Sequence, residues 1–468
     1  MSKLLGGLLL ITALALYLFF YRLGIPPLDN WDEAWYGEVA KQILATGDYL
    51  HLRWNGATFL DKPPLYFWLV AAIAKVTGNL SELVVRLPSA ISGLSLAALL
   101  YWHAAKKYSN LAGLLGAGSF LFNHLVVWRT RSGNLDTFAS LLVFGGYLLL
   151  SGKSRYRFPL LGLLLALVYL TKAALVGFPL AATFFYLLLF EARELRQKPV
   201  LLLQLIFSFA IPAALWLGLG YLRVGSEFVR YFVYQSDQGI SRLSLSNLSP
   251  DYFLFLYYSY SRRLVVPIII GFLAAVLRPR SKHHFLLLAF SLPFFLFLLF
   301  SSRDNNWYLL PILPFTSLYF AYGTSLVFRL FRQNILVKAG VAALCCFIFY
   351  RSYVVNLQPI LNTYSSASQK ESGLMLNQLT DSSDLVVRLN QEYPATIYYS
   401  DRQVLVYQDN PSSSGLFVNA ESLSELVQSD QVNWLSGSPA EITKVQEMLA
   451  VPSEVIEVNQ SESLLHLL

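Results

Sequence analysis

Two short stretches near the N-terminus carry most of the information in this chain. They are Asp29-Asn30-Trp31-Asp32-Glu33-Ala34-Trp35-Tyr36-Gly37-Glu38-Val39-Ala40 and Leu60-Asp61-Lys62-Pro63-Pro64-Leu65. Both stretches lie in a polar segment, residues 22–82, which follows a single apolar run at residues 4–21. That run is long enough to cross a lipid bilayer. The sequence therefore predicts a cluster of charged and aromatic side chains at a membrane surface.

The composition of the whole chain agrees with a membrane protein. Of its 468 residues, 55% are hydrophobic and 13% are charged, whereas average soluble domains carry about 25% charged residues. These values exclude an ordinary soluble enzyme, a disordered chain and a coiled coil. Cys345 and Cys346 are adjacent in an apolar run, which excludes a disulfide scaffold and a cysteine-rich metal site.

Apolar runs long enough to span a bilayer recur along the first 353 residues. We expect about eleven spans, and hence an all-α polytopic membrane domain over residues 1–353. The predicted spans are 4–21, 83–103, 111–128, 134–150, 158–172, 174–190, 200–220, 253–277, 284–301, 307–328 and 335–353. The first span follows Lys3 and has no small-residue cleavage site after it, so we expect a retained anchor.

Basic residues set the orientation of these spans. The net charge of +7 comes from Lys and Arg in alternate short loops, as in cytoplasmic loops, and does not indicate nucleic-acid binding. The basic loops lie at 106–107, 153–157, 193–198, 278–282 and 329–332. The N-terminus is therefore predicted to be cytoplasmic. Residues 22–82, residues 221–252 and the tail would then lie outside.

The tail, residues 354–468, differs in composition and is rich in Ser, Gln, Asn and Asp. We expect a small periplasmic α/β domain with strands near 385–387 and 396–399 and helices near 421–428 and 441–449. It contains no clustered acid, base or metal-ligand set. An accessory role is therefore predicted for this domain.

Asp32 and Glu33 are the first candidates for catalysis. A helix is expected from about Trp31 to Ala45, capped by Asp29 or Asn30, with both acids in its first turn. The helix dipole favours ionised carboxylates there, and an ionised carboxylate can accept the proton of a hydroxyl. Ordinary helix-start chemistry explains the same two residues equally well.

Asp61 and Lys62 form the second pair of candidates. Lys62 precedes Pro63-Pro64, so it is biased towards an extended conformation, and the prolines suit the start of a following helix. Side chains alternate along an extended segment, so the two residues need not face the same site.

Charged residues at the outer ends of spans form a third group. They are Asp136 at the start of the fourth span, Lys172 between the fifth and sixth, and Arg303 between the ninth and tenth. Such residues are costly near a membrane unless they are paired or line a cavity. The alternative is that each long side chain only reaches to the interface.

The two stretches in residues 22–82, at this spacing after one span, resemble the first periplasmic loop of membrane glycosyltransferases of the C-type fold. The nearest relatives are the aminoarabinose transferases acting on lipid A and the protein O-mannosyltransferases. The resemblance extends to about Leu330 through Leu135-Asp136, Leu170-Thr171-Lys172 and Tyr308-Leu309-Leu310-Pro311.

This resemblance implies an enzyme that uses a polyprenyl-phosphate sugar donor on the outer face of the membrane and transfers the sugar, with inversion, to an acceptor hydroxyl. Its implied catalytic residues are Asp32 as general base, Glu33, Asp61 and Asp136. Residues on the predicted outer side that could bind the donor phosphate are Lys62, Lys172, Arg242, Arg303 and Tyr308. Cations aimed at that phosphate would stabilise charge that develops in the transition state. The implied partners are the donor, a lipid, glycan or protein acceptor, and the lipids of a bacterial inner membrane.

The sequence departs from the pattern of these relatives at three places. Trp35 stands where the relatives often have Arg, and Asp61 replaces the Glu of a Glu-Lys-Pro motif. Residues 227–243 contain no His, although a His in this loop helps to bind a metal in some relatives. If a divalent metal ion binds, Asp61 and Asp136 with water are the expected oxygen ligands.

Two other classes of function are compatible with a polytopic chain. A transporter or lipid flippase would place its ionisable residues near the middle of the bilayer, within broken helices. No phosphate-binding glycine loop is present, so ATP-driven transport by this chain is not expected. A purely structural or assembly protein would not need the paired motifs of residues 29–40 and 60–65.

Overall fold

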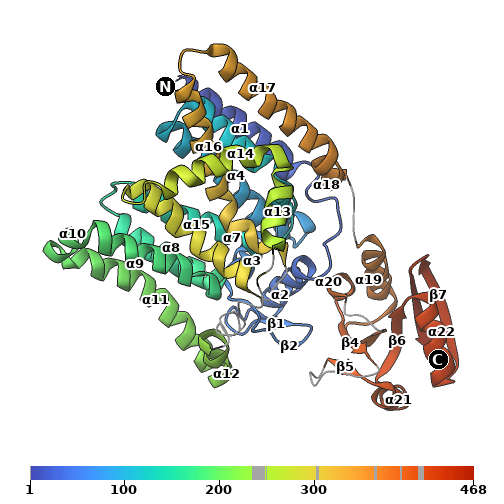
Figure 1. Cartoon of the computed structure of the whole chain (residues 1–468). Helices are drawn as coiled ribbons and strands as arrows, with labels where there is room; N and C mark the ends of the chain where they lie inside the picture. The colour runs from blue at the N-terminus through green and yellow to red at the C-terminus, as the bar shows by residue number, and fades with distance from the viewer. Residues whose placement is uncertain are drawn as a thin grey trace. The chain divides into compact units, whose positions relative to one another are not determined.

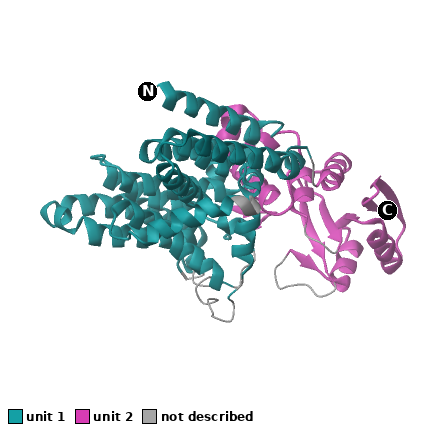
Figure 2. Ribbon diagram, turned by 45° about the horizontal axis from the view of Figure 1, so that its top comes forward, with its two compact units in different colours: residues 1–23, 60–69, 86–363 teal, residues 24–59, 70–85, 364–468 magenta. Residues whose placement is uncertain are grey.

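The computed structural model is mostly helical and ends in a small mixed sheet (Figure 1). It describes residues 2–234, 248, 250–301, 305–362, 366–389, 393–408 and 416–468, and the side chains of 234 and 261–263 are not described. Two compact units are distinguished by their contacts (Figure 2). Unit 1 comprises residues 1–23, 60–69 and 86–363, and unit 2 comprises residues 24–59, 70–85 and 364–468. The predicted division into domains 1–353 and 354–468 stays a prediction.

Unit 1 is built from helices. In chain order they are α1 (Ser2–Phe20), most of α4 (Glu82–Lys107), α5 (Asn110–Leu121), α6 (His124–Arg131), α7 (Leu135–Ser151), α8 (Arg157–Thr171), α9 (Gly177–Phe190), α10 (Ala192–Gln197), α11 (Pro199–Val224), α12 (Ser226–Val229), α13 (Asp251–Ser259), α14 (Ser261–Val276), α15 (Lys282–Phe300), α16 (Leu313–Leu330), α17 (Ile335–Ser352) and α18 (Gln358–Asn362). Short 3-10 turns η1 (Ala173–Leu175) and η5 (Asn306–Ile312) precede α9 and α16, and π-type turns η2 (Arg230–Tyr234) and η6 (Tyr353–Leu357) follow α12 and α17.

The helices confirm the prediction of an all-α polytopic membrane fold. Within the described residues, seven helical segments are long and apolar enough to cross a membrane. The number rises to nine if the bent pairs α5–α6 (62°) and α13–α14 (118°) each count as one span. The shorter apolar helices α7 and α8 lie where the fourth and fifth spans are predicted. The count of eleven spans stays a prediction.

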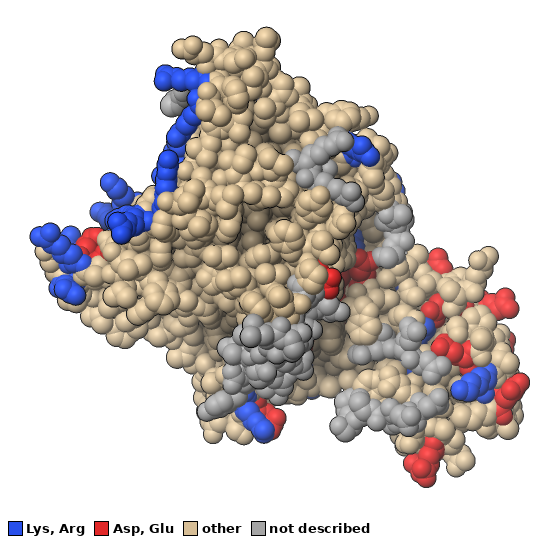
Figure 3. All heavy atoms as spheres, viewed as in Figure 1, with Lys and Arg blue, Asp and Glu red and all other residues tan. Residues whose placement is uncertain are grey.

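The surface of unit 1 has the charge distribution of a membrane protein. Figure 3 shows Lys and Arg atoms gathered at the end of α9 and at α10, beside a broad face without charge. Along α11, large apolar side chains such as Phe207, Ile211 and Leu215 are more than half exposed. Exposed apolar side chains are expected where a helix faces lipid.

The helices α14 and α16 cross closely at two glycines. A Cβ atom on Gly271 would lie 2.0 Å from the carbonyl oxygen of Tyr319, and one on Gly323 would lie 2.0 Å from that of Pro267. Small residues at such crossings allow helix backbones to pack tightly within membranes.

Two buried arginines fix the C-terminal end of α1. The Arg86 guanidinium donates to the carbonyl of Leu23 (2.8 Å), and Arg131 donates to the carbonyls of Leu18 (3.2 Å) and Tyr21 (2.9 Å). The last carbonyls of a helix lack partners within the helix. These contacts therefore set where the polar segment after α1 begins.

Unit 2 combines residues from the polar segment after α1 with the tail. It contains α2 (Asp32–Thr46), the antiparallel hairpin β1 (Arg53–Trp54) and β2 (Ala57–Thr58), and α19 (Ala367–Leu379). Asn55 and Gly56 form the hairpin turn with φ of 50° and 78°, the left-handed values that two-residue hairpin turns favour. The helix α3 (Leu65–Thr77) begins directly after Pro63-Pro64, as expected, and both α3 and α4 contain the boundary between the units.

The tail has the predicted α/β character. Its six-stranded sheet has the order β5-β4-β3-β6-β8-β7, in which β5, β4, β3 and β6 are parallel and β8 and β7 are antiparallel. The strands are β3 (Leu385–Leu389), β4 (Gln403–Tyr407), β5 (Phe417–Val418), β6 (Val432–Gly437), β7 (Ser453–Asn459) and β8 (Glu462–Leu467), and the helices are α20 (Pro394–Ser400), α21 (Ala420–Gln428) and α22 (Pro439–Leu449).

One predicted strand in the tail is wrong. Residues 396–399 belong to α20, not to a strand. Pro394 occupies the first turn of α20, where its fixed φ favours a helix. Every residue of the helix is buried. The segment therefore lacks the spacing of polar and apolar residues that would distinguish a helix from a strand.

Candidate active site

The helix α2 presents the first pair of candidate acids. It begins at Asp32, and the preceding residue, Trp31, has a φ of 70° and no side-chain cap. The expected cap from Asp29 or Asn30 is wrong, because the N-cap residue is Trp31. The Asn30 Oδ1 instead accepts a hydrogen bond from the Ala395 N–H (3.1 Å). The helix ends at Gly47, a left-handed residue with a φ of 68° whose N–H bonds back to Ile43.

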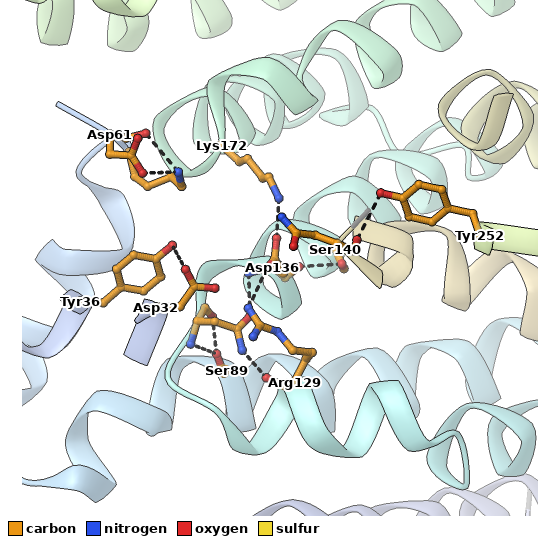
Figure 4. Close-up of polar contacts among 12 residues, drawn as sticks. Asp32, Tyr36, Asp61, Ser89, Arg129, Asp136, Ser140, Lys172 and Tyr252 are labelled. Carbon is orange, nitrogen blue, oxygen red and sulfur yellow. Dashed lines mark hydrogen bonds and ion pairs between the residues drawn. The ribbon is translucent and has the colours of Figure 1, made fainter. Parts of the chain in front are cut away.

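Asp32 and Glu33 have different surroundings in this first turn. Asp32 is half-buried, and its Oδ1 accepts a hydrogen bond from the Tyr36 hydroxyl at 3.3 Å (Figure 4). Glu33 is buried, and its Oε2 accepts the backbone N–H of Asp29 at 2.7 Å. Asp32 therefore remains partly open to solvent, while Glu33 holds the turn that precedes the helix.

Trp35 and Glu38 in α2 pack against neighbouring residues of unit 2. The Trp35 ring packs edge-on against those of Trp54 (5.3 Å between centroids) and Phe59 (5.8 Å). Glu38 is buried, and burial raises the pKa of its carboxyl, although the Lys41 ammonium, 3.6 Å from Oε2, acts in the opposite direction. Both residues support α2 from its buried side.

Asp61 and Lys62 contact each other. The Lys62 Nζ lies 2.6 Å from the Asp61 Oδ2, and the Tyr231 hydroxyl donates to the Asp61 Oδ1 at 3.0 Å. The sequence left open whether the two charged side chains face the same way, and the structure brings them together. Tyr231, from η2 in the predicted second outer segment, was missed because nothing in the local sequence pairs it with Asp61.

Asp136 lies between two cations. The Lys172 Nζ is 2.6 Å from its Oδ1 and the Arg129 guanidinium is 3.1 Å from its Oδ2, and Figure 4 shows them approaching from opposite sides. The Lys172 Nζ also lies 4.4 Å from the centroid of the Tyr308 ring, and Arg129 stacks over Trp307 at 5.0 Å. Lys172 is thus held by a carboxylate and by an aromatic face.

The local sequence explains why Asp136 is placed there. Asn134 caps α7, its Oδ1 accepting the N–H of Asp136 at 3.0 Å, so Asp136 falls in the first turn of the helix. Arg129 was not predicted as a site residue. Its only signal in the sequence is a charge at the end of an apolar run, seven residues before Asp136.

Each unit therefore contains its own set of candidate residues. Unit 1 brings together Asp61, Lys62 and Tyr231, and separately Asp136, Lys172, Arg129 and Tyr308. Unit 2 brings together Asp32, Glu33 and Tyr36. Arg242 and Arg303 lie outside the described residues.

The oxygen atoms proposed as metal ligands do not fit a divalent cation. Both oxygens of Asp136 contact positively charged groups, and those of Asp61 contact an ammonium group and a hydroxyl donor. Among the described residues, no group of three or more His, Cys, Asp or Glu side chains could hold a metal ion. A divalent cation at Asp61 would lie beside the Lys62 ammonium group, and one at Asp136 would lie beside Lys172 and Arg129, so each would meet positive charge.

Residues 61–216 match the family model of the dolichyl-phosphate-mannose-protein mannosyltransferases. The structure of ArnT from Cupriavidus metallidurans bound to undecaprenyl phosphate superposes with a TM-score of 0.79 over 98% of both chains, at 17% sequence identity. This chain has the C-type glycosyltransferase fold. The resemblance predicted from the motifs of residues 29–40 and 60–65 is confirmed.

Two curated relatives show the extent of the sequence similarity. An uncharacterized protein of Aquifex aeolicus is 28% identical over 256 residues, which are 52% of this chain and 49% of that protein. An undecaprenyl phosphate-alpha-4-amino-4-deoxy-L-arabinose arabinosyl transferase of Pseudomonas savastanoi is 33% identical over 136 residues, which are 28% of this chain and 24% of the transferase. The aligned stretches thus span less than half of these curated relatives. Together with the apolar helices, the fold identifies a multi-pass membrane protein.

Proposed function

We propose that this chain is a glycosyltransferase that moves a sugar from a polyprenyl-phosphate donor to an acceptor hydroxyl, with inversion at the anomeric carbon. The matched family segment, residues 61–216, supports this proposal because it contains Asp61, Lys62, Asp136 and Lys172. The ArnT structure with undecaprenyl phosphate supports the class of donor. The acceptor would be a lipid, a glycan or a protein.

The observation that carries the proposal is the position of Lys172 between Asp136 and the Tyr308 ring. With Arg129 included, one carboxylate faces two cations, so the cluster keeps a net positive charge. A donor phosphate with one negative charge leaves as a monoester that tends towards two. A cation already held in place stabilises that additional charge without rearrangement at the moment of reaction.

Lys62 is proposed to assist Lys172 at the phosphate, and Arg242 and Arg303 are proposed for the same role. Lys62 is more than a quarter exposed and is paired with a neighbouring carboxylate. Asp61 would therefore orient Lys62, as Asp136 orients Lys172. Neither carboxylate is proposed to accept a proton, because each is already bound to an ammonium group.

Asp32 is proposed as the general base. The acceptor oxygen would attack the anomeric carbon as the bond to the donor phosphate breaks, and the hydroxyl proton would pass to Asp32. Asp32 suits this role better than Glu33, because Asp32 is partly exposed whereas Glu33 is buried and bound to the Asp29 N–H. The products are the glycosylated acceptor and polyprenyl phosphate.

The location of the candidate acids favours an enzyme over a transporter. Asp32 and Asp61 follow the first apolar helix and precede α3, and Asp136 lies in the first turn of α7. None of the three is in the middle of an apolar helix, where the ionisable residues of transporters are found. We propose a bacterial inner-membrane location, with the N-terminus in the cytoplasm and these acids on the periplasmic side.

The proposal is tested by the release of undecaprenyl phosphate from undecaprenyl-phosphate pentoses and hexoses. Purified protein in detergent would be incubated with each donor and with a membrane extract of the host as the source of acceptor. Wild type should release the lipid phosphate from at least one donor. Asp32→Asn should lower turnover by roughly 10²–10⁴-fold, with unchanged binding of undecaprenyl phosphate.

Glu454→Gln is the matched control, because it removes one exposed carboxylate from β7. Its turnover should equal that of wild type. Near-normal turnover of Asp32→Asn would remove Asp32 as the base, and no release from any donor by wild type would contradict the proposed function.

A further inference from the structure

Residues 28–31, which lead into α2, are held by residues 364–468, the C-terminal segment of unit 2. The Leu28 N–H donates to the Tyr399 hydroxyl at 2.8 Å, and the Asn30 N–H donates to the Ser366 Oγ at 3.2 Å. The Asn30 side chain in turn accepts the N–H of Ala395 at 3.1 Å. These partners are more than 330 residues away in the sequence.

The conformation that these contacts hold is a strained one. Trp31 has a φ of 70°, a left-handed value that is unfavourable for a bulky side chain. A residue strained in this way persists only when its surroundings fix it. The Trp31 side chain is 54% exposed, so its own packing does not supply the compensation. Asp32 is the next residue.

The body of α2 is held by the same segment. A Cβ atom on Gly37 would lie 3.0 Å from the Tyr398 ring, so helix and ring are in close contact. The Lys41 ammonium donates to the Tyr398 carbonyl and lies 3.1 Å from the Asp401 carboxylate. Contacts from the C-terminal segment therefore continue along α2 beyond the turn that precedes Asp32.

The Tyr399 hydroxyl links the turn to a second ion pair. While it accepts from Leu28, it donates to the Glu82 Oε1 at 3.0 Å, and the Lys370 Nζ lies 2.6 Å from the same oxygen. Glu82 begins α4. The Tyr399 hydroxyl thus donates its proton to Glu82 and accepts a hydrogen bond from the Leu28 N–H, so it acts as donor and acceptor at once.

We propose that Tyr399 and Ser366 are positioning residues for Asp32: the C-terminal segment fixes the backbone of residues 28–31 and so sets where the carboxylate lies. The inference rests on the proposed function, in which Asp32 accepts the proton of the acceptor. A base must be within hydrogen-bond reach of that proton, and a misplacement of about 1 Å can lower a rate by roughly 10²-fold. This role differs from the accessory one that the composition of residues 354–468 predicts.

The test is the double variant Tyr399→Phe/Ser366→Ala, which removes two hydroxyl groups and no ring or charge. We expect kcat to fall by roughly tenfold or more, while the donor KM and the affinity for undecaprenyl phosphate stay within about twofold of wild type. The matched control is Tyr407→Phe/Ser424→Ala. In that control the Tyr407 hydroxyl contacts the Met448 sulfur and the Ser424 hydroxyl contacts the Ala420 carbonyl, both within the C-terminal segment.

If Tyr399 and Ser366 only stabilise the fold, the double variant should behave differently. In that case the double variant would lose thermal stability, but the kcat of the protein that remains folded would equal that of wild type, which would overturn the inference. If the double variant does not fold, Tyr399→Phe alone should lower kcat by about twofold to tenfold, the effect of one lost hydrogen bond. An unchanged kcat there would also overturn it.

The outcomes separate this inference from the proposed function. Transfer by wild type, its loss in Asp32→Asn, and full activity of the Tyr399 and Ser366 variants would overturn the inference alone. No transfer by wild type would overturn the proposed function itself.

Discussion

At the scale of single residues, the cluster around Asp136 joins one candidate acid to two cations, Arg129 and Lys172. Asp136 and Arg129 are both buried, with side chains 4% and 5% exposed, and they contact each other directly. An ion pair of this kind contributes little net stability compared with an apolar pair of the same shape. Removing one partner, however, leaves a buried charge without compensation.

We therefore expect Asp136→Asn to destabilise the protein by about 3–5 kcal/mol, because the amide cannot neutralise Arg129 and Lys172. The measurement is thermal unfolding of the purified protein in detergent, with Glu454→Gln as the control for loss of a surface carboxylate. Stability of Asp136→Asn equal to that of wild type would contradict the role of Asp136 as the holder of the two cations.

The sequence predicted individual candidate residues better than their contacts. Their chemistry and their positions beside apolar runs singled out Asp32, Asp61, Lys62, Asp136 and Lys172, and the catalytic and binding roles of these residues stay predictions. Arg129 and Tyr231 were missed, because a pairing between distant segments leaves no trace in a single sequence. The cap expected from Asn30 failed for the same reason, since its side chain contacts Ala395 in the tail.

At the scale of helices and strands, the apolar runs placed the helices well, since each predicted span coincides with one helix, a helix with its adjacent turn, or a bent pair. The breaks within the runs were not predicted, because α5–α6 and α13–α14 bend within continuous apolar sequence. The helix α20 was missed because its side chains are all buried, which removes the periodicity that distinguishes a helix from a strand.

The crossing of α14 and α16 gives a prediction at this scale. Gly271→Ala should destabilise the protein by about 1–3 kcal/mol, because the new methyl group would collide with the backbone of α16 and push the helices apart. Gly340→Ala in α17 is the control, since a Cβ atom there has no neighbour within 4 Å. Equal unfolding temperatures for the two variants would contradict the tight crossing.

At the scale of the whole molecule, composition separates the polar tail from the apolar first 353 residues, but contacts divide the chain differently. Unit 2 contains residues 24–59 and 70–85 together with the tail. Composition is a property of contiguous sequence, whereas the hydrogen bonds from Leu28 and Asn30 to the tail depend on the fold. The association of the α2 motif with the tail could not have been predicted from one sequence.

The proposed orientation predicts opposite results for two reporter fusions. A fusion after Gly152, between α7 and α8, should report the cytoplasm, because the loop that follows carries Lys153, Arg155 and Arg157. A fusion after Leu468 should report the periplasm. Alkaline phosphatase activity and green fluorescence measure the two sides, and the same side for both fusions would contradict the topology.

The central claim is that this chain transfers a sugar from a polyprenyl-phosphate donor with Asp32 as the base. Its most direct test is mass spectrometry of membrane glycolipids and envelope glycans from a deletion strain that carries wild type or Asp32→Asn at equal protein levels. We predict that one sugar modification disappears on deletion, returns with wild type and stays absent with Asp32→Asn, while a polyprenyl-phosphate sugar accumulates. Restoration of that modification by Asp32→Asn, or identical glycans in all strains, would contradict the claim.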